Sequence, residues 1–278
     1  MKMPKHFGKC RLCGKECVLT YEHVPPRNAF NSHTVIEYSF EDTIKTLTDN
    51  DRMPWDHSGL KGKQNQKGSG GYYLCRECNN NTGSWYMEEY VLFAKTLASM
   101  IYTEEFKERE IYDFTLFDLS PLKLYKAVIT LMCDTNHDGL GDEQIKAFIM
   151  NKESNDFDME KYQIYAYLVA PGSMRVTGKA AEIITTVPHP IIFSEVSHYP
   201  VGFTMYIDKP MGFEPFGVNI NSFVKCSYNE KCNISFHGMP YVSLNTHIPI
   251  DFRSKDEIKN CRVETEKRLQ SMDKKGNG

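Results

Sequence analysis

Four of the nine cysteines in this sequence stand in two CxxC pairs, Cys10 with Cys13 and Cys75 with Cys78. Each pair can supply two thiolates to one ion, and two pairs complete the tetrahedral set that Zn²⁺ prefers. Gly14 suits the tight turn after the first pair. Two unrelated pairs or a redox CxxC are the alternatives, but neither pair lies in a thioredoxin-like strand–helix–strand context. The spacing therefore predicts one structural zinc site, closed across the 61 residues between the pairs.

Two further motifs accompany the cysteine pairs. YEHVPPR occupies residues 21–27, and NNN occupies residues 79–81, directly after the second pair. Read in order, CRLCG, EHVPP and LCRECNNNTG resemble the pattern of HNH (ββα-metal) endonucleases, in the subgroup that carries CxxC zinc pairs. The resemblance covers residues 8–95. It implies a treble-clef-like module in which a β-hairpin and a helix surround a catalytic metal, with the zinc at its base.

The resemblance also implies catalytic roles for three residues. His23 matches the general base that deprotonates water, Glu22 matches the acidic ligand of a divalent metal, and Asn79 matches the last ligand position. An imidazole titrates near neutral pH, which suits a base, and hard oxygen ligands suit Mg²⁺ or Mn²⁺. Neighbouring residues of a strand face opposite sides, so Glu22 and His23 share a site only at a strand end or a bulge. Pro25 and Pro26 predict a strand end there.

The sequence departs from the family pattern between these motifs. Gly70 stands where many members have an asparagine that constrains the loop, a role that Asn65 could take instead. His23 and Cys75 are separated by 51 residues, which is longer than in compact members. The asparagine after Cys78 also suits a plain helix cap. These departures keep open an inactive, zinc-structured nucleic-acid-binding module as the alternative.

Four basic residues are candidates for contacts with nucleic acid. Arg27 follows the EHVPP motif and could clamp a phosphate or form a surface ion pair. Lys61, Lys63 and Lys67 lie in the long segment before the second pair and are typical of a phosphate-contacting loop, although solvated lysines are the default. Residues 1–83 carry 12 Lys+Arg against 9 Asp+Glu, whereas the remainder carries 21 against 27. The basic charge therefore lies in the segment that holds the motifs.

Two other patterns in the second half could bind a metal. Residues 134–139, DTNHDG, match the first half of an EF-hand calcium loop, but the twelfth position is Ile145 instead of Glu. We interpret this segment as a loop between helices. Cys226 and Cys232 flank a turn-like stretch and could approach each other across a hairpin, as a second metal or redox site. We expect reduced thiols at the cysteines outside the CxxC pairs, which are Cys17, Cys133, Cys226, Cys232 and Cys261.

Periodicity predicts a mixed α+β chain around these motifs. A helix follows the second pair, with Tyr86, Tyr90, Phe93, Leu97 and Ile101 on one apolar face. Ser120 and Pro121 predict the start of a buried helix over 122–133, and a short helix is expected after Asp142 with Ile145, Phe148 and Ile149. Short β-favouring segments follow from about residue 161: KYQIYAYLVA, SMRVTG, AEIITTV, GFTMYI, FGVNI and CNISFHG. They predict an antiparallel sheet or sandwich.

The end of the chain predicts one more helix. Ser254 and Glu257 form a capping box, and Ile258, Cys261 and Leu269 fall on one side of the helix that follows. We expect two domains: residues 1–117 hold the HNH module, its zinc and the long helix, and residues 118–278 form a helical connector and a β-rich domain. The C-terminal domain is expected to have a regulatory or targeting role.

Composition sets the remaining expectations. The chain has 278 residues, a net charge of −3 and 41% hydrophobic residues, which is typical of a globular protein without long disordered regions. Without a membrane-spanning run or a signal-peptide pattern, it is expected to be soluble and cytoplasmic, with no membrane partner. The expected function is a metal-dependent endonuclease acting on phosphodiester bonds, chiefly in DNA. A nuclease effector gated by a ligand, a protein partner or self-association through the C-terminal domain is a further alternative.

Overall fold

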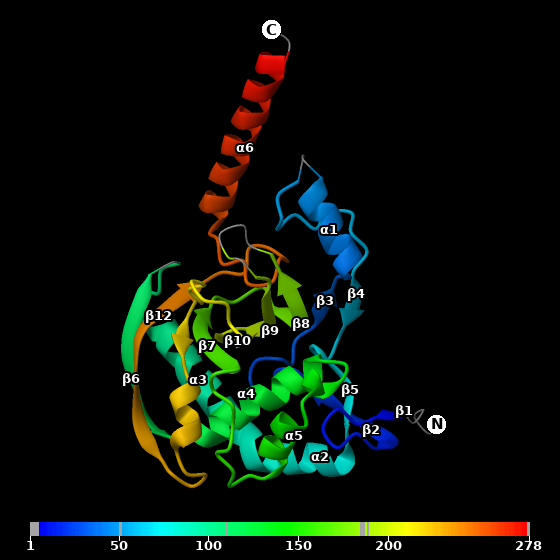
Figure 1. Ribbon diagram of the computed structural model, residues 1–278, viewed down its shortest axis with the longest axis vertical. Helices are drawn as coiled ribbons and strands as arrows, with labels where there is room; N and C mark the ends of the chain where they lie inside the picture. Colours follow the sequence, from blue (N-terminus) through cyan, green and yellow to red (C-terminus); the bar gives the residue numbers. More distant parts are fainter. Residues whose placement is uncertain (1–5, 50–51, 109, 184–186, 188, 277–278) are drawn as a thin grey trace.

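The computed structural model of the chain describes residues 6–49, 52–108, 110–183, 187 and 189–276. Its largest element is a seven-stranded sheet, and helices pack against this sheet and beside it (Figure 1). The predicted mixed α+β class is confirmed at this level. No helix in the described part of the chain is both long and apolar enough to cross a membrane.

The large sheet has the strand order β6-β12-β7-β10-β9-β8, and β11 pairs with β7 beside this path. Most neighbours are antiparallel, but β12 runs parallel to β7, with Tyr241 opposite Leu168. The prediction of an antiparallel sheet or sandwich is therefore wrong in part, because the chain forms one mixed sheet here. The strands are β6 (Ile111–Leu119), β7 (Tyr162–Val169), β8 (Arg175–Glu182), β9 (Ile191–His198), β10 (Val201–Ile207), β11 (Val218–Asn219) and β12 (Cys232–Val242).

Two of these strands, β6 and β9, were not predicted from the sequence. The segment AEIITTV, which was predicted to be a separate strand, contributes only its first residues to the end of β8, and residues 184–186 lie outside the described residues. Strand β9 carries a buried Glu195, which accepts hydrogen bonds from Arg175 at 2.8 Å and from Tyr167 at 2.7 Å. A charged residue at a buried position makes β9 difficult to predict from a run of apolar residues.

The predicted helices are present. A π-helical turn (Gly83–Met87) leads into α3 (Glu88–Thr103), and the predicted apolar face is buried at Tyr86, Tyr90, Phe93 and Leu97. Helix α4 (Pro121–Thr135) is buried along almost its whole length, as its sequence predicts. Helix α5 (Glu143–Met150) begins at Asp142, whose side chain caps it. Two short 3₁₀ helices span Gly139–Gly141 and Asn221–Lys225.

The N-cap predicted at Ser120 is wrong in its detail. The Ser120 side chain makes no capping hydrogen bond, and its hydroxyl is buried without a partner. Its backbone N–H instead bonds to the Glu89 carboxylate of α3 at 2.8 Å. An acidic side chain from a neighbouring helix thus supplies an acceptor at the start of α4.

One hydrophobic core joins both halves of the chain. On the sheet side, the Phe93 ring of α3 lies 6.4 Å from Phe203 of β10 and 6.0 Å from Phe236 of β12. The same core cluster includes the zinc-pair residue Cys10 and the β12 residue Met239. The boundary expected at residue 117 falls inside β6. The division into two domains stays a prediction, and the core runs across it.

A separate small sheet carries the sequence motifs, with the order β1-β2-β5. Its strands are β1 (Phe7–Lys9), β2 (Glu16–His23) and β5 (Gly70–Cys75), and helix α2 (Arg76–Thr82) follows β5 directly. The long segment between the motifs forms helix α1 (Phe40–Thr48) and a pair of short strands, β3 (Val35–Glu37) and β4 (Lys63–Asn65). This segment between β2 and β5, called the insertion below, therefore has secondary structure of its own.

Helix α6 (Lys255–Gly276) stands away from the rest of the molecule (Figure 1). The predicted capping box is confirmed: the Ser254 N–H bonds to the Glu257 carboxylate at 2.7 Å, and the Glu257 N–H bonds to the Ser254 hydroxyl at 3.2 Å. Of the expected apolar side, Ile258 is buried but Cys261 is exposed, and the Leu269 side chain lies outside the described residues. The helix therefore docks only through its first turns.

Candidate functional site

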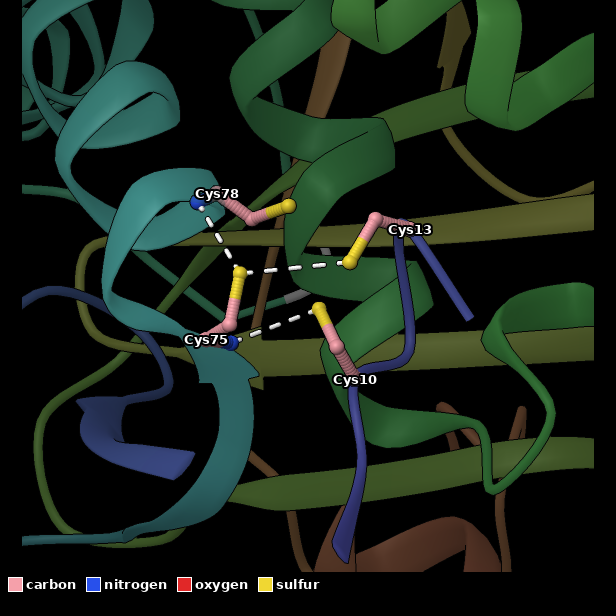
Figure 2. Close-up of side chains that lie close together, drawn as sticks. All are labelled: Cys10, Cys13, Cys75 and Cys78. Atoms are coloured by element: carbon pink, nitrogen blue, oxygen red, sulfur yellow. Dashed lines mark hydrogen bonds between the residues drawn. The ribbon is translucent and has the colours of Figure 1, made fainter. Parts of the chain in front are cut away.

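The four cysteines of the CxxC pairs come together as predicted. Cys10 and Cys13 lie in the turn between β1 and β2, and Cys75 and Cys78 lie at the junction of β5 and α2 (Figure 2). Their sulfur atoms all lie within 4.8 Å of one another, and the Cys13 and Cys75 sulfurs are 3.9 Å apart. Such a group could hold a metal ion, and four cysteine sulfurs are a typical donor set for zinc.

Backbone geometry holds the sulfurs in place. The Cys75 N–H points to the Cys10 sulfur at 3.3 Å, and the Cys78 N–H points to the Cys75 sulfur at 3.4 Å. Gly14 has a φ of 71°, a left-handed conformation that closes the turn with a bond from its N–H to the Cys10 carbonyl. N–H groups aimed at sulfur stabilise thiolates, so the site favours the form that binds metal.

The pKa values of these thiols shift in different directions. A hydrogen bond with Cys78 lowers the pKa of Cys10 to about 4, and the same contact raises the pKa of Cys78. Burial raises the pKa of Cys13. A bound divalent cation replaces such protons, because thiolates are the metal-binding form. Cys17 lies outside this group, and its thiol donates to the Lys15 carbonyl.

The EHVPP motif lies at the end of the strand that pairs with β5. In this antiparallel pair Glu22 lies opposite Gly71 and His23 opposite Gly70, and the register shifts at Thr20 and Tyr21. His23 is the last residue of β2. A strand end and an irregular register are both present, as a shared site for Glu22 and His23 requires.

One cavity of about 220 Å³ gathers the candidate catalytic residues. It lies where β2, α2 and α4 meet, and Glu22, His23 and Asn79 are all on its wall. The sequence separates Glu22 from Asn79 by more than fifty residues, and the hairpin brings them back together. The lining residues are Tyr21, Glu22, His23, Pro26, Arg27, Asn79, Gly83, Met87, Leu131 and Asp134.

His23 is held in a defined orientation. Its Nε2 lies 3.0 Å from the Lys67 carbonyl, and because a carbonyl can only accept, Nε2 carries the proton and donates it. Burial lowers the pKa of His23. The imidazole is therefore neutral at pH 7, and its Nδ1 has a free lone pair. A neutral imidazole with one nitrogen anchored can accept a proton at the other.

Glu22 and Asn79 both line this cavity and carry side-chain oxygen atoms. The Glu22 Oε1 atom is buried without a hydrogen-bond partner among the described residues, and burial raises the pKa of Glu22 to about 7. The Asn79 side chain donates through Nδ2 to the Thr20 hydroxyl at 2.9 Å, and the Thr20 hydroxyl donates to the Leu74 carbonyl. This chain of bonds orients the Asn79 amide and does not use its Oδ1 atom.

The four predicted phosphate-contacting residues do not all lie at this cavity. Arg27 lines it with an exposed side chain, and Lys67 lies beside it because its carbonyl binds His23. Lys61 and Lys63 are exposed, at the edge of β4, and are not among the lining residues. Nothing in the structure brings those two lysines to the candidate active site.

Asn31 is a supporting residue that the sequence analysis missed. Its side chain is 1% exposed, and its Nδ2 donates to the Pro25 carbonyl at 2.6 Å and to the Ser69 carbonyl at 2.8 Å. Its Oδ1 accepts from the Ser69 N–H at 2.8 Å. Asn31 therefore joins the two ends of the insertion, directly after β2 and directly before β5.

This finding changes the interpretation of Gly70 and Asn65. A Cβ atom at Gly70 would lie 2.1 Å from the Glu22 carbonyl oxygen, so an asparagine does not fit there without a shift of the backbone. Asn65 contacts the Tyr21 hydroxyl at 3.4 Å, a long bond at the edge of the hairpin. Asn65 also accepts a hydrogen bond from the Lys67 N–H at 3.3 Å, so Asn31 and Asn65 both constrain the loop before Gly70. No local pattern in the sequence marks Asn31.

The EF-hand-like segment forms no calcium loop. Asp134 is the penultimate residue of α4 and is buried, and the Asn136 amide donates to the Met132 carbonyl and to the Ser194 hydroxyl. The segment is a loop between α4 and α5, as interpreted from the sequence. Cys226 and Cys232 are free thiols, and burial raises the pKa of Cys226.

Comparisons with known proteins find no match. No protein-family model, no curated protein and no solved structure matches this chain. Any assignment of function therefore has to be argued from the geometry of the cysteine cluster and of the neighbouring cavity.

Proposed function

We propose that this chain is a metal-dependent endonuclease of the HNH (ββα-metal) type that hydrolyses phosphodiester bonds, with DNA as the expected substrate. The observation that carries the proposal is the meeting of Glu22, His23 and Asn79 at one cavity. They come from a strand, β2, and from the helix α2 that follows its partner strand. A four-cysteine cluster lies at the base of the same strands and helix.

The residues divide the chemistry of hydrolysis between them. The free Nδ1 of His23 accepts a proton from a water molecule as the water oxygen forms a bond to phosphorus, and the bond from phosphorus to the leaving oxygen breaks. The leaving oxygen takes a proton from solvent. The hydrogen bond to the Lys67 carbonyl keeps the ring oriented and becomes stronger when the imidazole is protonated.

A divalent cation such as Mg²⁺ or Mn²⁺ would neutralise charge on the phosphate and on the leaving oxygen. Glu22 and Asn79 would hold it. The buried Glu22 Oε1 atom without a partner fits this role, because an orphaned carboxylate oxygen is costly unless it gains a cation or a donor. Arg27, which lines the same cavity, would bind the phosphate next to the scissile bond. Zinc at the four cysteines would contribute folding energy on the order of 10–16 kcal/mol.

The test is cleavage of supercoiled plasmid by the purified protein with and without Mg²⁺ or Mn²⁺. His23→Ala is expected to reduce the rate by about 10²–10⁴-fold, which a positioned base typically contributes. His237→Ala is the matched control, because His237 is 77% exposed and lies outside the cavity lining. Folding and zinc content should be unchanged in both variants.

Three outcomes distinguish the possibilities. Metal-dependent cleavage that is lost only in His23→Ala supports the nuclease. DNA binding without cleavage by the wild type supports the inactive binding module. Cleavage at the wild-type rate by His23→Ala rules out the assigned base.

A further inference from the structure

Asp134 is a buried carboxylate that the proposed chemistry does not use. It belongs to α4, outside the hairpin and helix that carry the motifs, and its side chain reaches the wall of the same cavity. The residue is only 2% exposed. Its Oδ1 atom is buried and has no hydrogen-bond partner among the described residues.

Two carboxylates, each with one buried oxygen that has no partner among the described residues, therefore line one cavity. The other is Glu22, whose Oε1 atom also has no partner. Burial raises the pKa of Asp134, the charge of Glu22 raises it further, and the charge of Arg11 lowers it. Burying one such group unpaired costs several kcal/mol, and two like charges side by side cost more. A ligand that binds both groups removes this cost.

Helix α4 is fixed against the zinc-binding turn, so Asp134 has a defined position. The Arg11 guanidinium stacks on Tyr73 at 4.1 Å and donates a hydrogen bond to the Asp134 backbone carbonyl. Gly139 approaches the same turn so closely that a Cβ there would lie 2.0 Å from the Arg11 carbonyl oxygen. The Arg11 bond goes to the backbone carbonyl of Asp134, so it does not occupy the carboxylate.

We propose that Asp134 is a ligand of the divalent cation and completes, with Glu22 and Asn79, an oxygen donor set contributed by three elements. This inference rests on the proposed function only in placing that cation at Glu22. Mg²⁺ and Mn²⁺ prefer such hard oxygen ligands, and water fills the remaining positions. Strand β2, helix α2 and helix α4 then each supply one ligand, so the site is incomplete without residues beyond 117.

Mn²⁺ alone is a suitable probe, because its free concentration can be followed by electron paramagnetic resonance. The zinc-loaded full-length protein is titrated as wild type, Asp134→Asn, Glu22→Gln and the control Asp138→Asn. Asp138 is exposed in the loop that follows α4, and it is not among the residues that line the cavity. The wild type and Asp138→Asn should bind one Mn²⁺ with equal affinity, and the other two variants should bind at least tenfold more weakly.

Thermal melting of the same proteins separates a ligand from a structural residue. Without Mn²⁺, Asp134→Asn should melt no lower than the wild type, because the substitution removes an unpaired buried carboxyl group. With Mn²⁺, the wild type should gain stability and Asp134→Asn should not. Asp134→Ser provides a second variant if the asparagine does not fold.

The outcomes also separate the two proposals. Wild-type Mn²⁺ affinity in Asp134→Asn, with loss of binding in Glu22→Gln, overturns the role of Asp134 and leaves the nuclease proposal standing. A strong loss of stability or of zinc without Mn²⁺ in both Asp134 variants shows a structural residue and also overturns the inference. No binding of Mn²⁺ by the wild type, together with no plasmid cleavage, overturns both.

Discussion

Asn31 offers the sharpest test of how the insertion is anchored. Asn31→Ala removes three hydrogen bonds of 2.6, 2.8 and 2.8 Å and leaves two carbonyls and one N–H of the loop without their partner. A net contribution of about 1 kcal/mol for each bond predicts a loss of about 2–4 kcal/mol in the free energy of unfolding. The site is 1% exposed, so water replaces these bonds poorly.

The substitution should also disturb the candidate active site. Asn31 fixes Pro25, two residues after His23, and Ser69, two residues after Lys67, whose carbonyl anchors His23. The variant should therefore cleave plasmid more slowly while it retains its zinc, because none of the four cysteines is touched. The assays are urea unfolding, zinc content and cleavage rate.

Asn28→Ala is the matched control for stability, since Asn28 lies in the same segment with an exposed side chain. It should unfold within about 0.5 kcal/mol of the wild type. If Asn31→Ala is as stable as this control, Asn31 does not anchor the insertion, and the reasoning from its three bonds is refuted.

Three further predictions concern zinc, acid stability and the division of the chain. Cys75→Ala should lose its zinc and fold poorly, whereas Cys17→Ala should keep one zinc per chain; equal zinc content in the two variants would exclude the four-cysteine site. Burial lowers the pKa of His247 from 6.5 to about 4, and the charges of His57 and Arg175 act in the same direction. Between pH 6.5 and pH 4 the unfolded chain therefore binds a proton at His247 that the folded chain does not bind. The free energy of unfolding should fall by about 1–2 kcal/mol from pH 7 to pH 5. Urea unfolding should show a smaller fall in His247→Gln, and an equal fall would exclude His247 as the cause. A fragment of residues 118–278 lacks α3, so it should expose Phe203 and Phe236 and aggregate; cooperative unfolding of a soluble fragment would instead support two domains.

The cysteine cluster could be predicted because its chemistry is local. Each CxxC pair is recognisable within four consecutive residues. Only the approach of the two pairs to each other depends on the fold. The helix after the second pair was predictable for a similar reason, because Tyr90, Phe93 and Leu97 repeat at helical spacing. Sequence reasoning therefore succeeds where a pattern is short or periodic.

The supporting residues could not be predicted, because their partners lie far along the chain. Asn31 bonds to Ser69, 38 residues away, and nothing near Asn31 indicates that contact. The sequence indicated a role for Asp134 only as part of half a calcium-loop pattern. Its position on the same cavity as Glu22 depends on how α4 packs. Likewise, β9 was missed because Glu195, a charged residue, is fully buried in it. Long-range contacts between polar groups leave no periodic signal.

The position of β12 has a consequence for the synthesis of the protein. β6 lies at the edge of the sheet and pairs with β12. Leu119 can therefore pair with Cys232 only after the chain has been synthesised beyond residue 232. The aromatic neighbours of Phe93 in the described part of the chain likewise lie in β10 and β12. A nascent or prematurely terminated chain that stops before residue 232 thus exposes the apolar side chains that β12 covers, among them Phe93. Such chains are expected to be recognised by chaperones and degraded by proteases, so the candidate active site would reach its folded form only in nearly complete chains.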